Sequence, residues 1–229
     1  MQLVFLFILG IITGSFLNVL ALRLPKGESI WGRSRCDKCH KTLQWYDLVP
    51  LLSFVFSLGK CRYCKTPISP SYFFIELATG LLFVWFDRIL DLIILGALIV
   101  IFIADLKYMT VPDIVAWPAM ALVIVLYPEN WLGALLAAGF FALFVLVSRE
   151  TWMGWGDVEI AFIMGFMLGF PEVIFALTLA FWLGAIVGVI LIIKNKKNLK
   201  SAIPFGPFLI IATILTLKLG FPLDFFFNL

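Results

Sequence analysis

Charged residues are scarce in this sequence, and their scarcity excludes a soluble globular domain. Only 14% of the 229 residues are Asp, Glu, Lys or Arg, whereas 63% are hydrophobic, and the mean hydropathy is +1.09. A soluble fold of this composition would have too few polar residues to cover its surface. Apolar segments of spanning length recur along the whole sequence, so we predict an all-α, polytopic membrane helical bundle.

The residues that most nucleophilic enzymes use are also missing. The sequence has a single histidine, His40, and no G-x-S-x-G motif. Its four cysteines fall in two close pairs that are typical of metal ligands. Serine-type and cysteine-type catalysis therefore have little support.

Eight apolar runs predict about eight membrane spans. The first has no Lys or Arg before it, so we interpret it as a retained anchor and not as a signal peptide. Lys and Arg gather in alternate connections, which places the N-terminus outside and the polar stretch 23–70 in the cytoplasm. The Lys194–Lys200 cluster is interpreted as an orienting charge loop, with contact to anionic lipid as a weaker alternative. The runs are at about 3–22, 72–86, 89–104, 114–127, 131–147, 158–170, 173–193 and 205–219.

This pattern predicts three parts: a first transmembrane helix (1–22), a cytoplasmic loop (23–70) and a transmembrane catalytic bundle (71–229). The loop holds two C-x-x-C pairs, Cys36 with Cys39 and Cys61 with Cys64. Their separation is that of a zinc ribbon, and four thiolates would complete a closed, structural Zn²⁺ site. Two disulfides or four unpaired thiols are the alternatives, and a reducing cytoplasm argues against disulfides. We interpret His40 as a loop residue.

Two aspartates at the cytoplasmic ends of predicted spans indicate which type of catalysis the protein could perform. Gly154-Trp155-Gly156-Asp157 opens one apolar run, and Asp105 ends another. Paired carboxylates can share a proton, so that one polarises a carbonyl while the other takes a proton from water. That is the chemistry of an aspartic protease, and it needs no cofactor. The plainer interpretation is that each Asp caps a helix or pairs with a nearby cation.

Other acidic residues in or near the apolar runs are harder to assign. For Asp113, which follows Pro112, and for Glu159 we favour more strongly the interpretation that the residue lies at the membrane boundary and only caps a helix or pairs with a cation. Glu76 lies within an apolar run, so we expect it to support the site or to contact substrate.

Five ordered motifs resemble the bacterial type IV prepilin peptidases, which are membrane aspartic proteases of the G-x-G-D type. The resemblance covers nearly the whole chain. The motifs are Gly14-Ser15-Phe16-Leu17-Asn18-Val19 running on to Arg23-Leu24-Pro25, the two cysteine pairs, Asp105 with Pro112-Asp113, Gly154-Trp155-Gly156-Asp157, and Ile203-Pro204-Phe205-Gly206-Pro207-Phe208.

The resemblance implies an endopeptidase of the bacterial inner membrane. It would remove the basic leader of prepilins or pseudopilins at the cytoplasmic face, with Asp105 and Asp157 as the catalytic pair. It also implies methylation of the new N-terminus from S-adenosylmethionine. No G-x-G-x-x-G fingerprint occurs in the cysteine loop, so residues that bind this cofactor cannot be named. Membrane lipid is an expected partner and nucleic acid is not.

One position departs from the family pattern, since Glu159 stands where relatives usually carry Lys. Two other function classes remain open. A proton- or cation-coupled transporter could use the same aspartates, although transporters usually place their sites near the bilayer midplane. A zinc-loop scaffold of a pilus or secretion system would need no chemistry at all.

Overall fold

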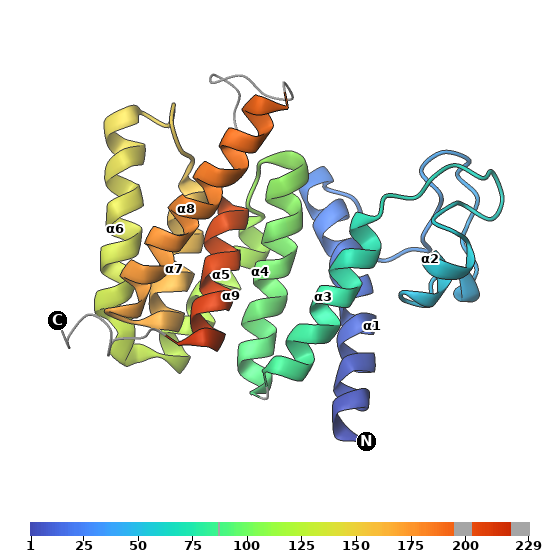
Figure 1. The fold of residues 1–229 in the computed structure, drawn as a ribbon, viewed down its shortest axis with the longest axis horizontal. Helices are drawn as coiled ribbons and strands as arrows, with labels where there is room; N and C mark the ends of the chain where they lie inside the picture. The colour runs from blue at the N-terminus through green and yellow to red at the C-terminus, as the bar shows by residue number, and fades with distance from the viewer. Residues whose placement is uncertain (87, 195–202, 221–229) are drawn as a thin grey trace. The chain divides into compact units, whose positions relative to one another are not determined.

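The computed structural model describes residues 1–86, 88–194 and 203–220, and its long regular elements are all α-helices (Figure 1). This confirms the all-α prediction. The α-helices are α1 (Gln2–Arg23), α2 (Leu52–Phe56), α3 (Ser71–Trp85), α4 (Ile89–Tyr108), α5 (Asp113–Leu126), α6 (Trp131–Ser148), α7 (Trp155–Leu168), α8 (Glu172–Ile193) and α9 (Gly206–Leu219). Three short 3₁₀ turns lie at Leu24–Lys26, Trp45–Asp47 and Pro128–Asn130.

Each of the eight predicted apolar runs coincides with a helix, but not every helix has the length of a span. Among the described residues, four segments are long and apolar enough to cross a membrane: Gln2–Lys26, Ile89–Tyr108, Pro128–Ser148 and Glu172–Ile193. Helices α3, α5 and α9 are shorter and apolar, and α7 has only 14 residues. The count of eight spans therefore stays a prediction, as does the orientation. Most of the Lys194–Lys200 cluster lies outside the described residues.

The chain forms two compact units, Met1–Ile103 and Ala104–Leu229. In the first unit, α1 packs along α3 through a small-residue face (Figure 1). A Cβ on Gly10 would lie 2.8 Å from Gly80 Cα, and one on Gly14 would lie 2.9 Å from the Thr79 side chain. Gly10 and Gly14 form a G-x-x-x-G pair, which lets two membrane helices approach closely.

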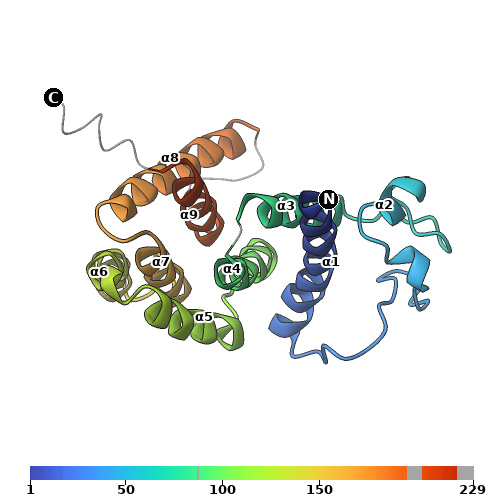
Figure 2. The ribbon, with the colours of Figure 1, turned by 90° about the horizontal axis from the view of Figure 1, so that it is seen from below.

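In the second unit, α7 lies between α5, α6 and α9 (Figure 2). The contact between α6 and α7 is close: a Cβ on Gly133 would lie 2.7 Å from the Gly165 carbonyl oxygen. The start of α9 is fixed by an aromatic cluster. The ring of Phe205 lies 5.0 Å from that of Phe181 on α8 and 5.8 Å from that of Phe141 on α6. These contacts place α7 and the beginning of α9 in one packed unit.

Candidate active site and metal-binding loop

The two cysteine pairs form two turns of the same construction. In the first turn, the N–H of His40 donates to the Cys36 carbonyl, and the N–H of Cys36 donates to the Lys41 carbonyl. In the second turn, the N–H of Lys65 donates to the Cys61 carbonyl, and the N–H of Cys61 donates to the Thr66 carbonyl. The residue after each second cysteine has a positive φ, 56° at His40 and 59° at Lys65. His40 thus occupies a turn position of the loop, and the four thiols are brought together from two matching turns.

The geometry of the four thiols fits a single tetrahedral ion. Their sulfur atoms all lie within 4.8 Å of one another, and Cys36 Sγ is 3.8 Å from Cys64 Sγ. Four Zn–S bonds of about 2.3 Å in a tetrahedron place the sulfurs about 3.8 Å apart. All four cysteines are free of disulfides. The set leaves no ligand position for substrate, so a bound ion would stabilise the loop.

Local hydrogen bonds favour the thiolate form at two cysteines of this cluster, whereas burial and the neighbouring thiols raise the pKa of a third, Cys39, to about 11. The Thr66 hydroxyl, 3.4 Å from Cys64 Sγ, and the Thr66 backbone N–H lower the pKa of Cys64 to about 6. The backbone N–H groups of Cys39 and Lys38 lower the pKa of Cys36. A lowered pKa keeps a thiol ionised at neutral pH, which is the form that binds a metal.

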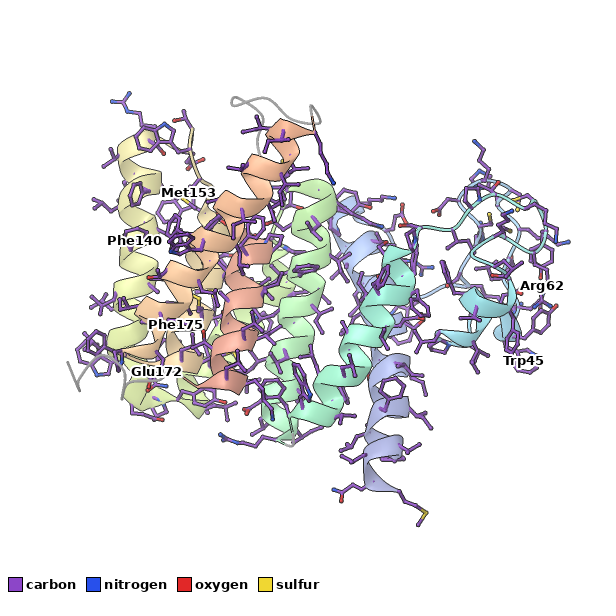
Figure 3. The ribbon with its side chains drawn as sticks, viewed as in Figure 1. Trp45, Arg62, Phe140, Met153, Glu172 and Phe175 are labelled. Carbon is purple, nitrogen blue, oxygen red and sulfur yellow. The ribbon has the colours of Figure 1, made fainter. Side chains whose placement is uncertain are left out.

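Asp47 holds the segment between the two turns. Its carboxylate accepts hydrogen bonds from the Tyr63 hydroxyl at 2.9 Å and from the Gln44 N–H at 3.1 Å, and it pairs with Arg62 at 3.3 Å. Figure 3 shows Arg62 and Trp45 on this loop, where the Trp45 side chain is 76% exposed. The loop is therefore ordered by its own polar contacts while it presents apolar side chains outward.

Glu76 joins the loop to α3. The Leu51 N–H donates to Glu76 Oε2 at 2.8 Å, and the Glu76 side chain is buried. Leu51 has a φ of 60°, so the chain turns sharply at the residue that Glu76 holds. Glu76 thus anchors the loop within the first unit. Contact with substrate, the other role expected from the sequence, stays a prediction.

The second unit contains a cavity of about 400 Å³ that brings Asp105 and Asp157 together. Asp105 lies in the last turn of α4, and Asp157 in the first turn of α7. The two carboxylates interact electrostatically. The remaining lining residues are Met109, Thr110, Val111, Asp113, Trp152, Met153, Gly154, Trp155, Gly156, Glu159, Ile203, Pro204 and Phe205. A cavity of this size admits a short extended segment of a peptide but not a folded domain.

The G-x-G-D segment forms the start of α7. Asp157 is the third helical residue; its N–H donates to the Gly154 carbonyl at 3.2 Å, and its carboxylate accepts the Gly154 N–H. This reciprocal bond is a helix cap, so Asp157 both caps α7 and lines the cavity. A Cβ on Gly156 would lie 2.5 Å from Val111 Cγ2, whereas one on Gly154 would meet nothing within 4 Å. Close packing thus requires glycine at 156 and not at 154.

Asp105 is buried, at 7% exposure, and the backbone of Gly206 lies against it. The Gly206 N–H donates to the Asp105 carboxylate. An added Cβ on Gly206 would lie 2.6 Å from Asp105 Oδ2. Gly206 belongs to the Ile203–Phe208 segment, one of the five motifs that resemble the prepilin peptidases, and the sequence assigns it no role. No sequence signal links it to Asp105, because the contact joins two helices that are far apart in the chain.

The cavity also includes the two acids that the sequence interpretation set aside as boundary residues. Asp113 is the first residue of α5, after Pro112 at the N-cap, and it is exposed. Glu159 interacts with the Trp117 side chain through a hydrogen bond, but its Oε2 is buried and has no hydrogen-bond partner among the described residues. Four carboxylates therefore line the cavity, and among the described residues that line it none is Lys or Arg.

Comparisons with known proteins cover both units. A family model described as "Bacterial Peptidase A24 N-terminal domain" matches residues 8–87, and one described as "Type IV leader peptidase family" matches residues 92–189. The chain is 32% identical to the prepilin leader peptidase/N-methyltransferase of Bacillus subtilis (strain 168), over 94% of this chain and 93% of that protein. The protein of the same name from Pseudomonas aeruginosa is 30% identical, over 93% and 89%. No solved structure gives a significant match.

Proposed function

The chain belongs to the type IV leader peptidase family, and we propose that it is an aspartic endopeptidase that removes the basic leader of prepilins or pseudopilins. We place this reaction at the cytoplasmic face of the bacterial inner membrane, with Asp105 and Asp157 as the catalytic pair. The observation that carries the assignment is the cavity, which holds both carboxylates although they come from different helices.

The proposed reaction uses the two carboxylates in different protonation states. The ionised Asp takes a proton from a water molecule, whose oxygen attacks the scissile carbonyl carbon, while the protonated Asp donates to the carbonyl oxygen. The C–N bond then breaks: the leaving amine takes the proton that the first Asp had accepted, and a hydroxyl group of the tetrahedral intermediate returns a proton to the second Asp as the product carboxyl group forms. No metal is needed for this step.

The charges of the cavity fit the expected substrate. The four carboxylates that line the cavity favour a positively charged segment close to the scissile bond. A basic leader provides such a segment, and the apolar helix that follows it would lie in the bilayer. The scissile residues must leave the helix before they are cut, because a helical backbone uses its carbonyls in hydrogen bonds.

The cysteine loop supplies the second part of the proposal. We propose that it binds one structural Zn²⁺ through Cys36, Cys39, Cys61 and Cys64, which fits their sulfur distances. N-methylation of the new N-terminus from S-adenosylmethionine is proposed from the names of the relatives. The described residues do not assign a site for this cofactor.

The test is leader cleavage in proteoliposomes with a model prepilin. Asp105→Asn and Asp157→Asn should each bind the substrate but leave the leader attached, because Asn can neither accept nor donate the catalytic proton. Asp91→Asn is the matched control, since Asp91 lies in the first turn of α4 and does not line the cavity. Mass spectrometry of the product reports cleavage and N-terminal methylation together.

The outcomes separate the function classes. Loss of cleavage in both cavity variants, with activity in Asp91→Asn, supports the protease. Cleavage that persists in either cavity variant contradicts the paired-aspartate assignment. Ion or proton flux that depends on Asp105 and Asp157, without any cleavage by the wild type, would favour the transporter. Neither cleavage nor flux would favour the scaffold.

A further inference from the structure

The first turn of α9 approaches Asp105 more closely than any side chain would allow. A Cβ added to Gly206 would lie 2.6 Å from Asp105 Oδ2 and 2.7 Å from Ile160 Cδ1. Both distances are far below the roughly 3.5–4.0 Å at which carbon atoms pack. An added side chain would therefore force the Asp105 carboxylate or the end of the Ile160 side chain to shift.

The backbone of Gly206 also binds the carboxylate. Its N–H is one of the first amides of α9, which have no partner within the helix. It donates to Asp105 instead. The next residue is Pro207, which has no N–H. The N–H of Gly206 and the absence of a side chain at this residue thus both act on the Asp105 carboxylate.

The Phe205 ring keeps this turn in place. It packs against both Phe141 and Phe181, with ring centroids 5.8 Å and 5.0 Å away. The Phe205 carbonyl accepts the N–H groups of Phe208 at 3.0 Å and Leu209 at 3.3 Å, which closes the first turn of α9. Gly206 therefore lies on a rigid element, as a group that orients a catalytic side chain must.

We propose that Gly206 is a positioning residue for the cleavage reaction. It holds the Asp105 carboxylate in the orientation from which it acts with Asp157, through one N–H bond and through the space it leaves. This inference rests on the proposed function, since it needs Asp105 to be catalytic. It gives the Ile203–Phe208 segment a role that neither its composition nor its position in the sequence indicates.

The first experiment measures kcat, KM and melting temperature for Gly206→Ala. Displacement of a catalytic group by about 1 Å lowers the rate about 100-fold, so we expect kcat to fall by that factor while KM stays close to the wild-type value. Gly188→Ala is the matched control, because a Cβ there would meet only Ile203 Cδ1 at 3.9 Å. It should cleave like the wild type. A wild-type kcat in Gly206→Ala would overturn the proposal.

A double variant separates positioning from simple packing. Ile160→Val removes the Cδ1 atom that the new methyl group would strike, but it leaves the contact with Asp105. If Gly206 positions Asp105, Gly206→Ala combined with Ile160→Val stays about 100-fold slow. If the double variant regains the kcat of Ile160→Val alone, the glycine only accommodates Ile160 and the proposal fails.

A spectroscopic test does not require Gly206→Ala to fold. Phe205–Gly206 is the single Phe–Gly pair in the sequence, so ¹³C-carbonyl Phe with ¹⁵N-Gly labels one amide. In Asp105→Asn a neutral side chain replaces the charged acceptor, so the Gly206 amide proton should move to lower frequency. It should stay in place in Asp113→Asn. An unmoved signal in Asp105→Asn would overturn the proposal.

The outcomes of these tests distinguish a failure of the Gly206 proposal from a failure of the proposed function. If Asp105→Asn still cleaves, the catalytic assignment is wrong whatever Gly206 does. If Asp105→Asn is inactive while Gly206→Ala cleaves normally, the protease stands and only the role of Gly206 is lost.

Discussion

Gly165→Ala perturbs the packing of α7, the helix that carries Asp157. A Cβ on Gly165 would lie 2.4 Å from Ala134 Cα, 2.6 Å from Ala134 N and 2.6 Å from the Gly133 carbonyl oxygen. Carbon atoms pack at roughly 3.5–4.0 Å, so α6 and α7 would have to separate by about 1 Å. All three contacted atoms belong to the backbone of α6, so no side chain can rotate away to make space.

The expected cost follows from this overlap. Forcing an extra carbon into a packed helix contact costs about 1–3 kcal/mol, whereas Ala favours a helix interior over Gly by about 1 kcal/mol. Gly139→Ala is the matched control: Gly139 lies within α6, is exposed, and a Cβ there would meet nothing within 4 Å. The helix preference cancels between the two variants, so Gly165→Ala should be less stable than Gly139→Ala by about 1–3 kcal/mol.

Thermal unfolding in detergent measures this difference. For a chain of this size, about 1–3 kcal/mol corresponds to a melting temperature lower by roughly 2–12 °C. Gly165 lies about two turns from Asp157, so leader cleavage should also slow, by up to about 100-fold for a 1 Å displacement. If Gly165→Ala melts and cleaves like Gly139→Ala, α6 and α7 do not approach as closely as described here.

Three further changes test the loop and the cavity. Glu159→Lys places a cation among the cavity carboxylates, so KM for a substrate with a basic leader should rise more than KM for one with a neutral leader. Equal changes in the two KM values would contradict this reasoning. A chelator should remove zinc faster at pH 5 than at pH 7.5, because protons compete with zinc for the thiolates: the metal-free Cys64 thiol, with its pKa lowered to about 6, is protonated at pH 5 and then rebinds zinc poorly. Metal analysis of the recovered protein checks this, and pH-independent release would refute it. Glu76→Ala should make the segment around Leu51 more sensitive to proteolysis, whereas Glu76→Gln keeps a hydrogen-bond acceptor and should protect the segment. Equal sensitivity of the two variants would refute the role of Glu76 as the anchor of the loop.

Local patterns made the helices and the cysteine loop predictable. Apolar runs report helices directly because a bilayer-exposed backbone must satisfy its own hydrogen bonds, and the eight runs match the helices within a few residues. The spacing of Cys36, Cys39, Cys61 and Cys64 predicted the cluster because each C-x-x-C pair fits within one turn. The sequence does not predict the likeness of the two turns, because that likeness lies in backbone hydrogen bonds and positive φ angles more than in shared residue types.

Tertiary packing decided what the sequence could not show. Asp157 had two competing interpretations, a helix cap or a cavity residue, and it is both. Glu159 lines the cavity as well, but its place two residues after Asp157 in the sequence does not indicate this. The role of Gly206 depends on where α9 begins relative to Asp105, and neither residue carries a local signal of that contact.

The charge balance of the cavity connects these findings. Where the structure describes its lining, the cavity has four carboxylates and no Lys or Arg. Backbone N–H groups donate to two of the carboxylates, Gly206 to Asp105 and Gly154 to Asp157. A helix N-terminus carries only about half of a positive charge, so these amides orient the carboxylates without neutralising the cavity. Within the proposed function, the remaining positive charge comes with the basic leader. Leader binding would then relieve repulsion among the carboxylates, so leader charge should affect both affinity and the protonation of the catalytic pair.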